Sequence, residues 1–127
     1  MPKFNKIERL CRRSDIDQLF SSGYSFFKYP LKLIWRPCNW DNNISVKVVI
    51  SVSKHKFKRA VDRNKIKRLV RESFRLNKFV LEDGLKGQKI HLAIVFVGKE
   101  MPDFATVDQI INEMFKRLIV EHEKLAG

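Results

Sequence analysis

Lysine and arginine side chains are concentrated between residues 54 and 78, and their chemistry is that of phosphate binding. The stretch holds eleven of these cations against two carboxylates, a net charge of +9 in a chain whose formal net charge is +12. An arginine can donate two parallel hydrogen bonds to one phosphate, whereas a lysine acts as a point charge. The cations are Lys54, Lys56, Lys58, Arg59, Arg63, Lys65, Lys67, Arg68, Arg71, Arg75 and Lys78.

The spacing of these residues predicts one amphipathic helix, from about residue 58 to residue 77. At about 100° per residue, one arc carries Arg63, Lys67, Arg71 and Arg75, with Asn64 and Arg68 beside it. The opposite arc is expected to face the core through Ile66, Leu69, Val70, Ser73 and Leu76.

The cationic arc indicates an anionic partner. Like charges four residues apart on a helix repel by a few tenths of a kcal/mol per pair. A polyanion would neutralise them, and nucleic acid fits a strongly basic chain better than an anionic membrane does. The other interpretation is a solvated basic helix with no partner.

Length and composition predict a single folded domain over residues 1–127. The chain has 44% hydrophobic residues, including ten phenylalanines, which is enough for one core. No apolar run reaches the roughly 18 residues of a membrane span, and the first residues lack the apolar segment of a secretory signal. We therefore expect a cytoplasmic protein with no membrane partner.

Residues of the kinds that perform catalysis or bind metals are present but scattered. The sequence has no phosphate-binding loop, no dinucleotide-binding motif and no cysteine pair with zinc-ligand spacing. Cys11 and Cys38 are expected to be reduced thiols, and His91 to be structural. His55 has no partner that would form a catalytic triad. The sequence therefore indicates a binding protein, or a subunit of a complex in which another component performs the catalysis.

The elements before the basic stretch are an arm, a helix and strands. Residues 1–13 form a basic N-terminal arm, and Ser14 is expected to cap a short helix that ends at Ser21–Gly23. Strands are expected at 24–27, 31–37 and 45–53, and the short loop between the last two favours an antiparallel hairpin. Four side chains could offer stacking or apolar surface to an unpaired strand or simply pack in the core: Phe20, Tyr24, Ile34 and Phe57.

The elements after the basic stretch complete an α+β sandwich. A loop is expected at Glu82–Gly84 and Gly87, followed by a nearly all-apolar central strand at 89–97 and a helix from about Asp103. The predicted fold is a two-layer sandwich of order αβββαβα with a mostly antiparallel sheet. Strand 45–53, helix 58–77 and strand 89–97 would form a crossover if the two strands are parallel neighbours.

Two segments resemble the signature of the protein subunit of bacterial ribonuclease P. They are S-V-S-K at Ser51–Lys54 and A-V-D-R-N-K-I-K-R-L-V-R-E-S-F-R at Ala60–Arg75. The order of the other elements also agrees, so the resemblance covers roughly residues 4–120. It implies a small α+β sandwich with an uncommon left-handed βαβ crossover, where the physical default is right-handed.

The resemblance also implies a function. Such a protein assembles with a large catalytic RNA, and the complex removes the 5′ leader of precursor tRNA. The RNA carries the catalysis and holds the Mg²⁺ ions, with none bound by the protein alone, no catalytic residue in the chain and no protein partner required. The implied contacts to the catalytic RNA are Lys54, Lys56, Arg59, Arg63, Asn64, Lys67, Arg68 and Arg71.

The leader is implied to lie between the first helix and the sheet. The residues implied to contact it are Arg13, Phe20, Lys32 and Ile34. The family often has aromatic residues where this chain has Ile16 and Ile34, so the contact is expected to be mainly apolar and electrostatic. The alternative function is a stand-alone RNA-binding or ribosome-associated module without a role in cleavage. A protein-only nuclease would need a set of carboxylates or histidines that the sequence lacks.

Overall fold

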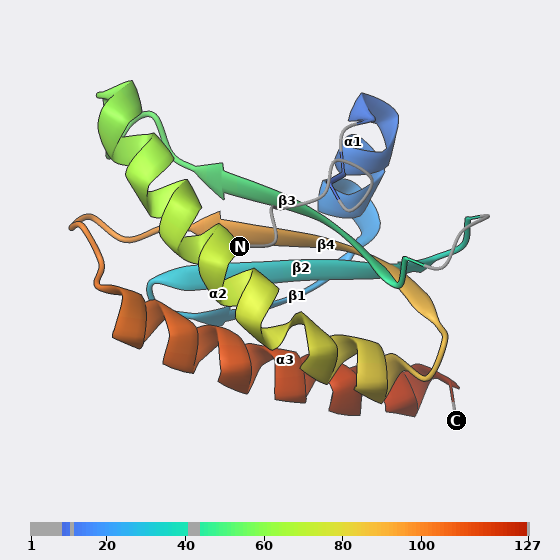
Figure 1. The fold of residues 1–127 in the computed structure, drawn as a ribbon. Helices are drawn as coiled ribbons and strands as arrows, with labels where there is room; N and C mark the ends of the chain where they lie inside the picture. The colour runs from blue at the N-terminus through green and yellow to red at the C-terminus, as the bar shows by residue number, and fades with distance from the viewer. Residues whose placement is uncertain (1–8, 11, 41–43, 127) are drawn as a thin grey trace.

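Over the residues that the structure describes, the fold consists of three helices and one four-stranded sheet (Figure 1). A computed structural model describes residues 9–126, except residue 11 and residues 41–43. Most of the predicted basic arm therefore lies outside the described residues. The elements are α1 (Arg13–Ser22), β1 (Tyr24–Lys28), β2 (Leu31–Cys38), β3 (Val46–Val52), α2 (Ala60–Leu85), β4 (Lys89–Phe96) and α3 (Phe104–Ala126). The predicted αβββαβα order and the α+β class are confirmed.

The sheet has the strand order β1-β2-β4-β3, so the predicted hairpin of strands 31–37 and 45–53 is wrong. Strand β4 lies between them, antiparallel to β2 and parallel to β3. A short loop is compatible with a hairpin but does not require one. The apolar β4 needs cover on both faces. Its central position places it under α2 and α3 on one face and under α1 on the other. The parallel pair makes β3–α2–β4 a crossover.

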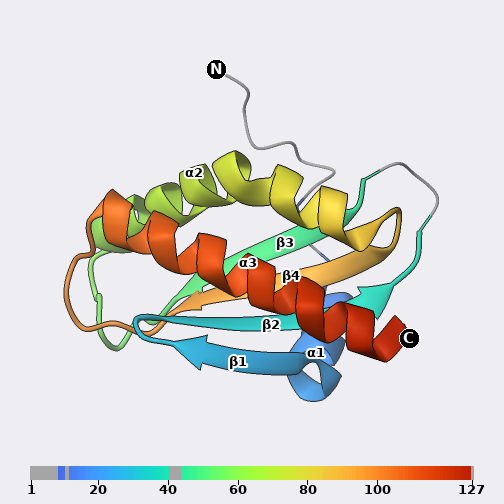
Figure 2. The ribbon, with the colours of Figure 1, turned by 90° about the horizontal axis from the view of Figure 1, so that it is seen from below.

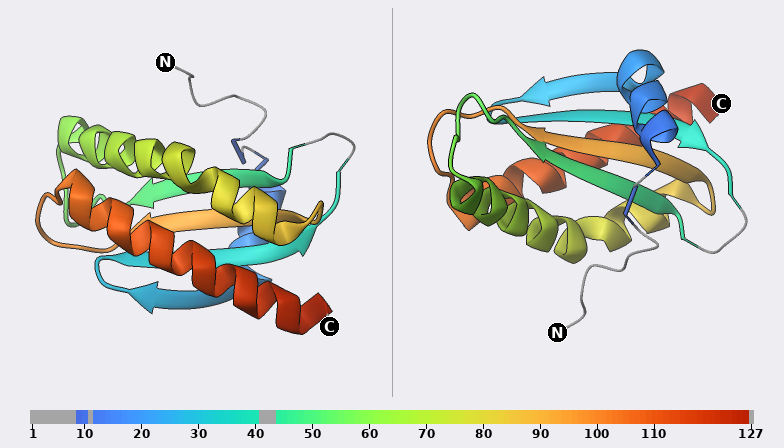
Figure 3. Two further views of the ribbon diagram at one scale, coloured as in Figure 1. Left: turned by 60° about the horizontal axis from the view of Figure 1, so that its bottom comes forward. Right: turned by 90° about the horizontal axis from the view of Figure 1, so that it is seen from above.

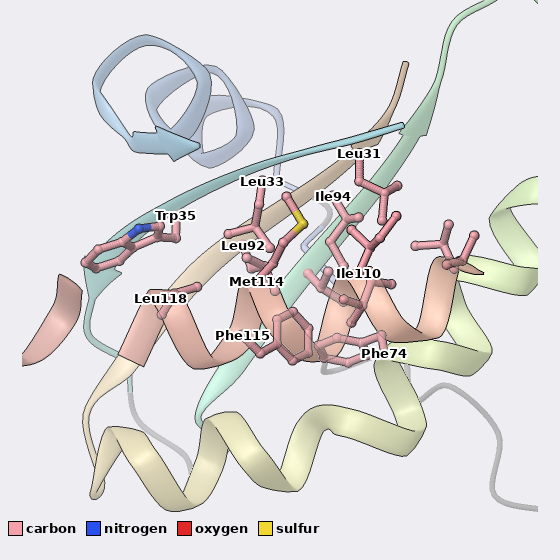
Figure 4. Packing of buried hydrophobic residues seen from close by; sticks show 14 of the residues in the cluster. Leu31, Leu33, Trp35, Phe74, Leu92, Ile94, Ile110, Met114, Phe115 and Leu118 are labelled. Carbon is pink, nitrogen blue, oxygen red and sulfur yellow. The ribbon is translucent and has the colours of Figure 1, made fainter. Parts of the chain in front are cut away.

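The two faces of the sheet are covered unequally. Figure 2 shows α2 and α3 side by side across one face, with α1 behind the sheet, and the right panel of Figure 3 shows α1 lying across the strands of the other face. Between the sheet and α2 and α3 lies the larger hydrophobic cluster, which includes Trp35, Phe74, Phe96 and Phe115 (Figure 4). A smaller cluster beneath α1 comprises Leu10, Leu19, Ile34 and Ala93.

Helix α2 continues two turns beyond its predicted end, so the predicted loop at Glu82–Gly84 is helical. Leu81 and Leu85 continue its buried side, and their burial favours the additional turns. Gly84 lies against α3, where an added Cβ would be 2.4 Å from Ile119 Cδ1. The glycine therefore permits close helix packing and does not end the helix.

The buried side of α2 also differs from the predicted arc. Leu76 is 43% exposed, whereas Phe74 and Asn77 are buried. Asn77 belongs to a polar network with α3, in which its Nδ2 and the Ser73 hydroxyl donate to Asp108 Oδ1, at 2.8 and 2.7 Å. Asn112 Nδ2 donates in turn to Asn77 Oδ1 at 2.9 Å. This network draws the buried side of α2 toward α3.

Helix α1 begins at Arg13, and Ser14 is not its N-cap. Arg12 is the N-cap, and its side chain makes no capping hydrogen bond. The helix ends as predicted at Gly23, whose N–H donates to the Leu19 carbonyl at 2.8 Å. Upstream, the Leu10 N–H donates to the Val48 carbonyl at 2.8 Å, which joins the chain before α1 to the edge strand β3.

Helix α3 begins next to the predicted Asp103. Asp103 accepts the Thr106 backbone N–H at 2.7 Å through its carboxylate, as an N-terminal cap does. The predicted apolar stripe of this helix is buried in the larger cluster through Val107, Ile111, Phe115 and Leu118. None of the described helices is long and apolar enough to cross a membrane.

Candidate nucleic-acid interface

The cationic side of α2 lies beside the edge strand β3. Lys67 and Arg71 are partly buried there and line a pocket with Arg9 and with residues 48–50 of β3. Asn64 and Arg68 are exposed on the same helix. The structure therefore brings together predicted residues from α2 and adds Arg9, which precedes α1 and was not among the predicted contacts.

Positive charges in this pocket act on one another. Burial lowers the pKa of the Arg71 guanidinium below its ordinary value, and the positive charges of Arg9 and Arg68 lower that pKa further. Gathering three guanidinium groups costs free energy that a bound anion would offset. A phosphate backbone is such an anion, and arginine donates to it with favourable geometry.

The loop that joins β3 to α2 is shaped by two of the predicted RNA contacts. Nη1 of Arg63 donates to the carbonyls of Phe57 and Lys58, at 2.7 and 2.8 Å. Lys56 Nζ donates to the carbonyl of Val97, just after β4. Arg63 has further N–H donors, so holding the loop leaves it able to contact a phosphate as well.

The remaining loop residues divide between the surface and the core. Lys54 and Arg59 are exposed. Phe57, by contrast, is 9% exposed and packs 5.9 Å from Phe96 between ring centroids, so it anchors the loop in the core and is not a stacking surface. We call Lys54, Lys56, Arg59, Arg63, Asn64, Lys67, Arg68 and Arg71 the helix surface.

The predicted leader contacts lie on the sheet face that carries α1, but Ile34 is not exposed as expected. Phe20 is 45% exposed on α1, Lys32 is exposed on β2, and the side chain of Arg13 is 94% exposed, 4.0 Å from Asp17. Ile34 is 5% exposed because α1 covers it in the smaller cluster. The position of α1 thus leaves Ile34 little surface for a ligand.

A neighbouring aromatic residue that the sequence interpretation missed is exposed on this face. Phe27 pairs with Lys32 in the β1–β2 register and is 55% exposed. Because paired residues share a face, Phe27 and Lys32 point to the same side of the sheet. Alternation along β1 could have indicated this, since Phe26 is buried and the next residue, Phe27, points to the opposite face of the sheet. We call Phe20, Phe27 and Lys32 the sheet surface.

Tyr24 belongs to the other side of the sheet. It pairs with Trp35, and the two ring centroids are 5.0 Å apart. Trp35 is buried in the larger cluster beneath α3. Tyr24 is half exposed, but on the side away from Phe20, so the two rings do not form one stacking surface.

The described residues contain no group of three or more histidine, cysteine, aspartate or glutamate side chains that could hold a metal ion. Cys38 is a free thiol, and burial raises its pKa above the ordinary value. Cys11 lies outside the described residues. His91 is buried against Cys38 and Trp40.

Comparisons with known proteins agree on one family. A family model described as Ribonuclease P matches residues 4–119. The "Ribonuclease P protein component" of Porphyromonas gingivalis is 40% identical over 116 residues, covering 90% of this chain and 85% of the relative. That of Thermotoga maritima is 33% identical over 115 residues, covering 91% and 95%. The solved structure of the Thermotoga maritima ribonuclease P protein superposes with a TM-score of 0.70 and 29% identity, covering 86% of this chain and 96% of that one.

Proposed function

The chain belongs to the ribonuclease P protein family, and from that premise we propose that it contacts two RNAs through two separate surfaces. It is the protein component of an endoribonuclease that processes tRNA, and it works with the ribonuclease P RNA. The helix surface contacts that RNA. The sheet surface contacts the 5′ leader of precursor tRNA.

The clustering of Arg9, Arg68 and Arg71 supports the first contact. Burial and the charges of Arg9 and Arg68 lower the pKa of Arg71, so a phosphate placed among the three guanidinium groups would be attracted and would also relieve their repulsion. Each phosphate neutralised also releases counterions from the RNA, which favours binding at low salt. The loop held by Lys56 and Arg63 carries two further exposed cations, Lys54 and Arg59, just before the same helix.

The exposed rings of Phe20 and Phe27 support the second contact. A protein holds unpaired RNA by stacking its bases on aromatic side chains and pairing its backbone with cations. The sheet surface combines these two kinds of group, because Lys32 lies opposite Phe27 in the register. A leader, unlike the folded body of a tRNA, exposes its bases for such stacking.

The chain's own chemistry in this reaction is positional and electrostatic. We propose that the Mg²⁺ ions are bound by the RNA, since the described part of the chain offers no cluster of ligands for them. The protein lowers the repulsion between two polyanions and holds the leader in place. No step of bond cleavage is assigned to a side chain.

The experiment that tests the leader contact compares two substrates. Holoenzyme is reconstituted with Phe20→Ala or Phe27→Ala protein, and the Kd is measured for precursor tRNA and for mature tRNA. Loss of a stacked base is expected to cost about 1–3 kcal/mol, so the preference for precursor tRNA falls by about tenfold. Phe79→Ala is the matched control, because Phe79 is 65% exposed on α2, away from the sheet surface. Equal weakening for both tRNAs would contradict the proposal.

A further inference from the structure

The sheet face that carries α1 also has a hollow, which does not include the residues of the sheet surface. It has a volume of about 390 Å³ and lies between the start of α1, the end of β2 and the start of β3. Arg36 at its edge follows Lys32 by four residues along β2, which places the two about 13 Å apart along the strand. Protein pockets that bind small molecules have volumes from about 300 Å³ upward, so this hollow is large enough for a ligand.

The floor of this hollow is fixed in place. The imidazole of His91 stacks on the Trp40 indole, with ring centroids 5.2 Å apart and planes 9° from parallel. Trp40 Nε1 donates to the Ile44 carbonyl at 2.8 Å, and His91 Nδ1 lies 3.3 Å from Cys38 Sγ. A ligand would therefore meet a surface that is already ordered, which limits the entropy lost on binding.

A histidine side chain in the floor offers a polar group to a ligand. His91 is 6% exposed and lines the hollow, and its contact with Cys38 uses Nδ1 and not the second ring nitrogen, Nε2. Burial lowers the pKa of His91, and the positive charges of Lys47 and Arg36 lower it too, against the carboxylate of Asp15. A neutral imidazole can hydrogen-bond a base or a ribose hydroxyl.

The rim of the hollow is cationic. Arg12, Arg36 and Lys47 line it together with one carboxylate, Asp15. Lys47 Nζ also lies 4.7 Å from the centroid of the Trp40 ring. Three cations converging on one concavity favour a phosphate, and Asp15 offers an acceptor for the donors of a base or a ribose.

The hollow is continuous with the helix surface. Arg9 acts electrostatically on Arg71 of α2 and pairs with Val48 of β3, the residue next to Lys47. Positive side chains thus lead from α2, around the β3 edge, to Lys47 and Arg12 at the rim. Phe27 and Lys32 of the sheet surface, by contrast, are separated from Arg36 along β2 by Ile34, which α1 covers.

We propose that this hollow holds an unpaired nucleotide of the ribonuclease P RNA, with its phosphate on Arg12, Arg36 and Lys47 and its base or ribose against His91. This inference rests on the proposed function, because it takes the RNA that binds the helix surface as its occupant. The RNA backbone would follow the cations from α2 around the β3 edge and end in the hollow.

The test removes charges at the rim and measures the effect on RNA binding and on the RNA footprint. Arg36→Gln, Lys47→Gln and the double variant are compared with Lys116→Gln, which removes an exposed charge from α3 on the opposite face. Kd for ribonuclease P RNA is measured over a range of salt concentrations, and the RNA backbone is footprinted at nucleotide resolution. The double variant is expected to bind about tenfold more weakly, and the salt slope of binding should fall by about one ion per cation removed. In the footprint, one nucleotide that the wild-type protein protects should lose its protection.

Two outcomes would overturn the inference. One is unchanged affinity and footprint in the double variant, and the other is loss of protection in the leader of precursor tRNA instead of the ribonuclease P RNA. Arg68→Ala on the helix surface is measured in parallel. If Arg68→Ala weakens RNA binding and the rim variants do not, only this inference fails. If Arg68→Ala also has no effect, the proposed function fails with it.

Discussion

The two faces of the sheet are built from the same strands but differ in how far helices cover them. On one face, α2 and α3 bury Leu33, Trp35 and their neighbours in the larger cluster. On the other face, α1 covers only Ile34, Ala93 and the residues around them, and leaves Phe27 and Lys32 exposed. Alternation along a strand therefore places one set of side chains in the larger cluster and leaves part of the other set exposed, where we propose that RNA binds.

Helix α2 divides its sides in the same way. Its buried side ends at α3 in the network of Ser73, Asn77 and Asp108. Its cationic side faces the β3 edge and solvent, where Arg68 and Arg71 lie. A substitution on one side should change stability, and a substitution on the other should change RNA binding.

The largest effect is expected in the core. Phe74→Ala removes a ring that is 1% exposed and should lower the free energy of unfolding by about 3–5 kcal/mol, because a cavity remains. Phe20→Ala should cost far less, since Phe20 is 45% exposed. Urea denaturation of both variants measures the difference, and similar losses would break the comparison between the two faces.

Gly84→Ala should also destabilise the protein, although alanine favours helices. The new Cβ would lie 2.4 Å from Ile119 Cδ1, and overpacking of this kind costs about 1–3 kcal/mol. The helix propensity of alanine would by itself gain about 1 kcal/mol. Thermal or urea unfolding measures the sum. In an Ile119→Ala background the loss should shrink, and an unchanged loss would show that the contact is not its cause.

Arg68→Ala and Arg63→Ala should separate RNA binding from loop structure. Arg68 is exposed, so its removal should reduce the salt slope of RNA binding by about one ion and change stability by less than about 0.5 kcal/mol. Arg63→Ala should weaken RNA binding and also destabilise the loop whose carbonyls it holds. Binding across a salt series, with urea denaturation alongside, gives both quantities. An unchanged slope in both variants would contradict the assigned surface.

The smallest effect is expected from pH. Burial lowers the pKa of His91 in the folded protein, so the unfolded chain binds a proton there more readily. The free energy of unfolding is therefore unaffected by this group above the ordinary histidine pKa of about 6.5, and it declines as the pH falls below that value. Unfolding free energies from pH 7.5 to 5 should show this decline in wild type and in His55→Gln, and a smaller one in His91→Gln. The same decline in His91→Gln would assign it to other groups.

The order of elements could be predicted because each depends on local patterns. The alternation of β2, the apolar run of β4 and the cationic arc of α2 are all visible in the sequence. The pairing of strands could not be, because a short loop does not decide whether β2 meets β3 or lets β4 between them. The end of α2 was missed because Gly84 is typical of a helix end, and only its contact with Ile119 explains a helical glycine.

The candidate site was predictable in its charges more than in its apolar part. The exposed cations Lys54, Arg59 and Arg68 needed only helical and loop positions. Ile34 is covered although exposure was expected, and Phe27, which was not among the predicted contacts, is exposed, because the place where α1 crosses the sheet decides which outward residue is covered. The joining of Arg9 to β3 likewise depends on tertiary structure.

The most direct test of the central claim is reconstitution of cleavage. The purified protein is mixed with a bacterial ribonuclease P RNA and precursor tRNA at a magnesium concentration where the RNA alone is nearly inactive. We predict release of the leader at the mature 5′ end only when protein and RNA are both present. Leader release by the protein without RNA, or no stimulation by protein that is shown to bind the RNA, would contradict the claim.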